Sequence, residues 1–179
     1  MADTHIYLEL DDVKGESTAA GFVDRAEIQS VRWGLSARNS QTVDEQTAAA
    51  QLDYDLVTLT KHFDSASLAF LKRTARFDGG GDQRRQAFET ARISYVDVVL
   101  DPDSPEAAKS VPVVEIVLKH GYIEDYQLST AEGSKSMRLE ETIKLSYRSI
   151  RFSYHLAVDG NRSRRHAVHF DGETAVGND

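Results

Sequence analysis

The sequence predicts a mainly β fold: a β-barrel of about seven or more mostly antiparallel strands, with one α-helix at about residues 65–77 packed on it. Several short runs alternate apolar and polar residues, which is the pattern of strands with one buried face. The alternation changes phase within several of these runs, and only one stretch shows helical spacing. A phase change favours strands that bend or bulge, as strands do where a sheet curls into a barrel.

The first strands are predicted from this alternation. Residues 5–10 alternate without a break. Residues 26–35 form a second predicted strand, with a bulge near Gln29 because the apolar positions on either side of it are out of phase. Residues 37–51 are polar and too numerous for a tight turn, so we expect a protruding loop. A third strand, with another phase change, is predicted over residues 52–63.

The predicted helix has a start signal, an apolar stripe and a stop signal. Asp64 or Ser65 can cap its first turn, and a run of three glycines at residues 79–81 ends it. The stripe follows the i, i+3, i+7 spacing of a helix face packed against a core. Its members are Leu68, Leu71 and Ala75.

The second half of the chain reads as further strands. Residues 86–100 predict one long or two short strands, and the prolines that follow predict a loop at residues 101–105. Residues 113–119 and 122–128 predict two more strands. The strongest alternation covers residues 143–156, where the phase slips after Tyr147.

Composition narrows the function classes. The 179 residues suit one domain, which we place at residues 1–159, with a polar C-terminal tail at residues 160–179. A net charge of −8 gives no general reason to bind nucleic acid or an anionic membrane. The absence of cysteine excludes disulfides and thiol chemistry. Residues 1–5 do not begin a secretory signal, so we expect synthesis in the cytoplasm and export only through machinery that accepts a folded chain.

The residues predict no enzyme, cofactor or metal site. His166 and His169 share a face only on a helix, and the tail has no helical pattern, so a metal site with Asp171 is not expected. Adjacent glutamates at 140 and 141 point to opposite faces of a strand and cannot act as an acid–base pair. The arginines at residues 162–165 are typical of surface charge or an interface contact.

Four motifs, in order along the chain, carry a resemblance to a known family. The first pairs residues 12–17 (Asp-Val-Lys-Gly-Glu-Ser) with residues 33–36 (Trp-Gly-Leu-Ser). The others are residues 59–64 (Leu-Thr-Lys-His-Phe-Asp) before the helix, residues 117–119 (Val-Leu-Lys) followed by Tyr122, and residues 138–147 (Arg-Leu-Glu-Glu-Thr-Ile-Lys-Leu-Ser-Tyr). Together they resemble the haemolysin-coregulated protein (Hcp) family, the tube subunits of type VI secretion. Residues 101–112 and the tail from Gly160 depart from the family pattern.

The resemblance implies a structural subunit. Six copies would form a closed ring, rings would stack into a tube inside a contractile sheath behind a spike tip, and the pore would carry and protect small effector proteins. The subunit would leave the cell through this apparatus. A monomeric ligand-binding barrel, or the related tube protein of contractile phages, are the alternative interpretations.

The resemblance also implies candidate site residues. Ser36 is the candidate pore-facing residue, although taken alone an ordinary serine at the end of a strand fits somewhat better. The loop at 37–51 would contact the next ring, or would be a surface loop without such a role. Its candidate stacking residues are Arg38, Asn39, Gln41, Asp44 and Glu45. Trp33 and Gly15 are predicted to be structural, Trp33 as part of the core.

Overall fold

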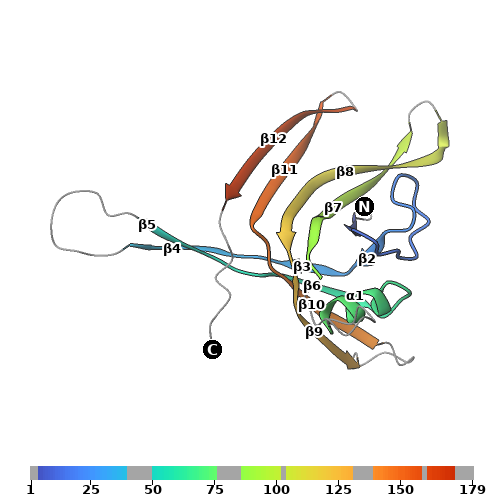
Figure 1. The fold of residues 1–179 in the computed structure, drawn as a ribbon. Helices are drawn as coiled ribbons and strands as arrows, with labels where there is room; N and C mark the ends of the chain where they lie inside the picture. The colour runs from blue at the N-terminus through green and yellow to red at the C-terminus, as the bar shows by residue number, and fades with distance from the viewer. Residues whose placement is uncertain are drawn as a thin grey trace, which may run out of the picture.

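The computed structural model of the chain describes residues 4–39, 50–75, 86–101, 104–130, 139–158 and 161–171. They form strands almost throughout, with one short helix (Figure 1). The strands are β1 Thr4–Leu10, β2 Ala26–Ile28, β3 Ser30–Arg32, β4 Leu35–Asn39, β5 Ala50–Tyr54, β6 Val57–His62, β7 Phe88–Asp101, β8 Ser104–Gly121, β9 Ile123–Thr130, β10 Leu139–Leu145, β11 Ser149–Val158 and β12 Asn161–Asp171, and the helix is α1 Ser67–Thr74. The prediction of a mainly β fold with one helix is confirmed.

The described strands fall into three sheets. A six-stranded sheet has the order β12-β11-β8-β7-β1-β2, a four-stranded sheet the order β3-β6-β10-β9, and β4 pairs with β5 alone. The pairings are antiparallel, as predicted. One detail is corrected: within the described residues the strand pairing does not close into a continuous barrel. Instead the two larger sheets share one core.

The phase slips in the sequence mark the places where the chain leaves one sheet for another. Gln29 separates β2 in the six-stranded sheet from β3 in the four-stranded sheet. Residues 146–148 take the chain from β10 back to β11 in the same way. Leu145 and Ile150, on either side of this slip, are both fully buried in the shared core. The slip therefore keeps apolar side chains pointing inward while the backbone changes sheet.

A third crossing, from β8 to β9 at Tyr122, is joined to the crossing at residues 146–148. The N–H of Ser146 donates to the carbonyl of Tyr122 at 2.9 Å, and the Ser146 hydroxyl accepts from the N–H of Tyr122 at 3.1 Å. A Cβ added at Gly121 would lie 1.9 Å from the Ser146 carbonyl oxygen, so only glycine permits this approach. The predicted break after residue 119 is therefore a crossing point between β8 and β9.

The helix is shorter than predicted and presents a different face to the protein. Helix α1 begins at Ser67, and the predicted end beyond Ala75 lies outside the described residues. The predicted stripe is wrong at all three positions, because Leu68 is 57% exposed, Leu71 is 36% exposed, and Ala75 is exposed as well. Phe70 is fully buried in their place. The helix is turned this way because Arg73, one turn further along, is also buried and donates to the carbonyls of residues 11 and 87.

Three segments predicted to lack regular structure contain strands. Residues 37–39 and 50–51, assigned to a loop, belong to β4 and β5; residues 40–49 lie outside the described residues. Residues 104–105, predicted as loop because of the prolines, begin the long strand β8. The segment assigned to a polar tail forms β12 over Asn161–Asp171, paired with β11. Strands β4, β5 and β12 lie at sheet edges, where polar residues are common and the apolar signal is weak, which explains why the sequence did not predict them. At the start of β8 the prolines outweighed the strand pattern.

Candidate assembly surfaces and the junction that supports them

A buried charged pair lies at the junction between β6 and α1. Lys61 in β6 stands directly opposite Glu141 in β10 in the sheet register. Both side chains are fully buried, and the Lys61 ammonium lies 2.8 Å from a Glu141 carboxylate oxygen. Buried charges are costly unless they are paired and hydrogen-bonded, so the geometry around them decides whether the junction is stable.

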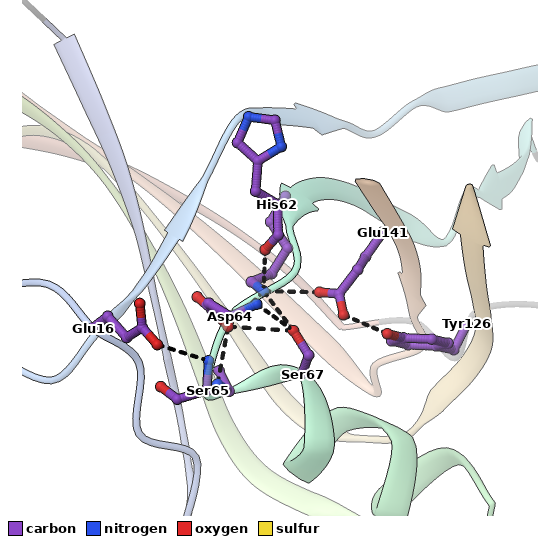
Figure 2. Close-up of polar contacts among 9 residues, drawn as sticks. Glu16, His62, Asp64, Ser65, Ser67, Tyr126 and Glu141 are labelled. Carbon is purple, nitrogen blue, oxygen red and sulfur yellow. Dashed lines mark hydrogen bonds and ion pairs between the residues drawn. The ribbon is translucent and has the colours of Figure 1, made fainter. Parts of the chain in front are cut away.

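The Lys61 ammonium is fully engaged. It donates to the Asp64 carboxylate and to the His62 carbonyl, each at 2.7 Å, and lies 3.1 Å from the Ser67 hydroxyl. Asp64 in turn accepts from the N–H of Ala66 at 2.9 Å, before the first turn of α1. One buried lysine thus fixes the strand end, the connecting turn and the start of the helix. Figure 2 shows its partners His62, Asp64, Ser67 and Glu141 gathered at this junction.

Tyr126 in β9 completes the network. Its hydroxyl donates a hydrogen bond to the second carboxylate oxygen of Glu141. Burial, followed by this hydrogen bond and by the negative charges of Glu141 and Asp64, raises the pKa of the Tyr126 hydroxyl well above its ordinary value. Glu141 therefore has a partner on each oxygen.

The junction also holds the first family-like motif. A Glu16 carboxylate oxygen accepts from the N–H of Ser65 at 3.1 Å, so the loop after β1 is tied to the turn before α1 (Figure 2). Gly15 passes so close to the next segment that a Cβ would lie 2.3 Å from the Arg25 carbonyl oxygen. Gly15 is structural in this sense: its place between two backbone segments excludes a side chain.

Sequence reasoning did not identify the Lys61–Glu141 pair, although a signal was present. Lys61 is in phase with Val57 and Leu59, and Glu141 is in phase with Ile143 and Leu145. All four of these apolar residues are fully buried. A charged residue in phase with the core face of each of two strands indicates a buried pair.

An open groove of about 710 Å³ lies beside the junction. The ends of β1 and β2, the Glu16 loop and the end of β6 form its walls. Carboxylates of Glu16, Glu27 and Asp64 line it together with two imidazoles, and its lining contains no lysine or arginine among the described residues. Its surface is therefore acidic; we call it the acidic groove.

A two-stranded arm made of β4 and β5 projects away from the two larger sheets (Figure 1). Leu35 opposite Tyr54, and Ala37 opposite Leu52, place apolar residues on one face of the arm. Leu35 is 40% exposed and Leu52 42% exposed. Because an isolated two-stranded hairpin is marginally stable, a half-exposed apolar face on such an arm is a candidate contact surface.

The predicted site residues lie on this arm or beyond it. Ser36 is exposed on β4, opposite Asp53 and on the other face from Leu35. Arg38 and Asn39 end β4, opposite Gln51 and Ala50. Gln41, Asp44 and Glu45 lie outside the described residues.

Trp33 lies at the base of the arm. It is partly buried and packs against the core, with its ring centroid 4.7 Å from that of Phe152. Its indole N–H donates to the Tyr147 hydroxyl at 2.6 Å, and that hydroxyl donates to the Asp55 carbonyl at 3.0 Å. The side chain therefore joins the arm to the sheet crossing after β10.

The two histidines of β12 have different neighbours. His169 lies 2.7 Å from the Asp171 carboxylate, and His166 stands opposite Tyr154 in the register. No cluster of three or more potential metal ligands occurs within the described ranges. Among all the residues that the structure describes, no helix is long and apolar enough to cross a membrane.

Over the described ranges, these features define a class of protein: two antiparallel sheets around one core, a single helix fixed by a buried ion pair, and a projecting two-stranded arm. A family model for type VI secretion system effector Hcp matches residues 7–154, which is most of the chain. The chain belongs to the Hcp family of type VI secretion.

Solved structures show the same fold. A type six secretion system protein superposes with a TM-score of 0.74 at 20% identity, covering 94% of this chain and 96% of that one. Hcp1 from Salmonella typhimurium gives a TM-score of 0.66 at 16% identity, with 96% and 95% covered. A type VI secretion system effector from Yersinia pestis gives 0.63 at 14% identity, with 93% and 98% covered. None of the curated proteins compared with the chain matches it.

Proposed function

We propose that the protein is the subunit of a type VI secretion tube, in which six copies form a ring and rings stack end to end. The observation that carries this proposal is the family match over residues 7–154 together with a fold shared over nearly the whole length of the neighbouring structures. The proposal gives the protein a structural role in secretion and no reaction of its own.

The projecting arm supports the stacking part of the proposal. Its apolar residues Leu35 and Leu52 remain substantially exposed in the single chain, whereas contact with another copy would cover them and stabilise the two-stranded arm. The candidate stacking residues Arg38, Asn39, Gln41, Asp44 and Glu45 belong to the arm or to the segment that connects its strands.

The pore is the proposed site of cargo. Ser36 is exposed on the polar face of the arm, and we propose that it faces the pore and contacts small effectors. The sheath and the spike tip of the same machine are the further proposed partners, and the protein would leave the cell through that machine. The monomeric ligand barrel receives less support, because apolar side chains from both larger sheets fill the space between them.

The experiment that tests the proposal is the solution mass of the purified protein by light scattering, with negative-stain images of the same fraction. Six times 19.9 kDa, with a central hole in the images, is the expected result. A particle of 19.9 kDa at micromolar concentration would overturn the ring and return attention to a ligand-binding protein.

A further inference from the structure

We propose that copies of this chain join through the two opposite edges of the six-stranded sheet, with the arginine-rich first half of β12 in one copy seated at the acidic groove beside β2 in the next. This inference rests on the proposed ring, and it names the surfaces that make it.

The two surfaces lie at opposite ends of the same sheet. Strand β12 is the last strand on one side and β2 is the last on the other, in the order β12-β11-β8-β7-β1-β2. Residues Glu27, Ile28 and Gln29, in and just after β2, form part of the groove wall. One copy therefore carries the groove at one edge and the strand that would meet it at the far edge.

The two edges carry opposite charge. Carboxylates of Glu16, Glu27 and Asp64 line the groove. In β12, by contrast, three of the four residues at positions 162–165 are arginines, although the chain as a whole has a net charge of −8. Arg164 and Arg165 stand opposite residues 156 and 155 of β11 in the register, within the paired part of the strand. The densest basic run of β12 is thus fixed to the sheet edge by backbone pairing.

Charge dictates how such edges can meet. A two-fold contact between identical edges would place arginine against arginine, or carboxylate against carboxylate, and like charges oppose association. Opposite edges attract, so the favoured contact is heterologous. A heterologous contact closes into a ring when its rotation allows and otherwise forms a filament.

Glu27 is the groove carboxylate best suited to the contact. Its side chain is 62% exposed, and its one hydrogen-bonded partner given by the structure is His5, at 3.1 Å. Glu16 and Asp64 hold the junction before α1, as described above, so they shape the groove as well as charging it. Reversing the charge at Glu27 therefore alters the surface without touching the buried network.

The alternative interpretation is that the arginines protect an edge strand from pairing with other strands. Charged residues at a sheet edge commonly prevent unwanted strand pairing. That role predicts that removing the charges promotes association, whereas a contact role predicts that reversing them opposes it. The two roles are thus separated by the direction of the effect.

The experiment measures assembly of two charge-reversed full-length chains by light scattering across a concentration series. The first is Glu27→Lys, and the second combines Arg164→Glu with Arg165→Glu. Each alone should require a protein concentration about tenfold or more higher for half-assembly than the wild type. Matched controls are Glu89→Lys and Arg32→Glu, at exposed positions outside the groove and outside β12, which should assemble like the wild type.

Mixing the two reversed chains provides the decisive result. The Glu27→Lys chain carries a lysine at position 27 of its groove and keeps the arginines of β12, whereas the double variant keeps Glu27 and carries glutamates at positions 164 and 165. In every alternating contact between them the charge at position 27 is opposite to the charges at positions 164 and 165, so an equal mixture should assemble at a lower protein concentration than either chain alone. A ring with an even number of subunits can alternate in this way and still close.

The outcomes separate this inference from the proposed function. Rings that form normally from the wild type and from both reversed chains would overturn the edge contact and leave the ring proposal intact. A wild type that stays at 19.9 kDa would overturn both. Circular dichroism and thermal midpoints of each variant establish folding, and rescue in the mixture would itself show that both reversed chains are folded.

Discussion

The junction before α1 and the β4–β5 arm differ in how completely the single chain buries and pairs their side chains. At the junction, the Lys61 ammonium and the Glu141 carboxylate are fully buried and receive all of their hydrogen bonds from the same chain. On the arm, apolar residues such as Leu35 remain substantially exposed on strands that pair only with each other in the described residues. The single subunit therefore pairs the buried charges of the first region, whereas it leaves an apolar face of the second region exposed.

This difference indicates where folding ends and assembly begins. Burying a charge without partners costs several kcal/mol, so a network such as the junction forms as part of the fold. Leaving an apolar face half exposed costs less free energy, so such a face can stay exposed until another copy covers it. Substitutions at the junction should therefore change the unfolding of the subunit, and substitutions on the arm should change its association.

The largest effect is expected at Lys61. We expect Lys61→Met to lower the free energy of unfolding by about 3–5 kcal/mol, because Glu141 would remain buried without its cation. Chemical denaturation measures this loss. Lys144→Met is the matched control on β10, since the Lys144–Asp125 pair lies at the surface and should contribute about 0–1 kcal/mol.

A double variant tests whether the loss comes from the pair. Lys61→Met combined with Glu141→Leu should recover part of the stability, because the uncompensated carboxylate is then absent. Additive losses in the double variant would show that the two side chains act separately. That result would contradict the account of the junction as one network.

A smaller loss is expected at Trp33, which joins the arm to the sheet crossing after β10. Trp33→Ala should lower the free energy of unfolding by about 3 kcal/mol, since the ring is only partly buried. Trp33→Phe, which keeps an aromatic ring beside Phe152 but lacks the donor to Tyr147, should cost about 1 kcal/mol. Denaturation of both variants distinguishes packing from hydrogen bonding, and equal losses would assign the whole effect to the hydrogen bond.

The sequence predicted most of this fold because its apolar alternation reports which face of a strand is buried. The phase slips near Gln29 and after Tyr147 located two sheet crossings. Alternation does not state which sheet a strand joins, so a curled barrel and two sheets with crossing strands gave the same pattern. The sequence therefore led to a barrel where the described strands form separate sheets.

The errors arose where local signals competed with tertiary contacts. Leu68 and Leu71 followed helical spacing, yet buried Phe70 and Arg73 determine the orientation of α1. The prolines before residue 106 suggested a loop, yet β8 begins at Ser104. The Lys61–Glu141 pair was missed because a charged residue on a core face becomes informative only once its partner strand is known.

On the arm, substitutions should leave the subunit folded and weaken its association. Leu52→Ser should change the free energy of unfolding by less than about 0.5 kcal/mol, because the side chain is already substantially exposed. Under the proposed function the same variant should lose stacked tubes in negative-stain images. Val23→Ser, at an exposed apolar residue away from the arm, is the matched control. Stacking unchanged by Leu52→Ser would remove the apolar face from the contact.

The smallest effect is a pH dependence that belongs to the junction alone. The pKa of the Tyr126 hydroxyl is raised in the folded state, so above about pH 10 the unfolded chain loses this proton before the folded chain does. The contribution of Tyr126 to stability is therefore complete below pH 10 and declines as the pH rises toward the folded-state pKa. Tyr126→Phe should be less stable than the wild type near neutral pH, and the gap should narrow above about pH 10. A gap that stays constant through the alkaline range would show that the hydroxyl is not held protonated by Glu141. Such a result would limit the buried network to Lys61, Asp64 and Glu141.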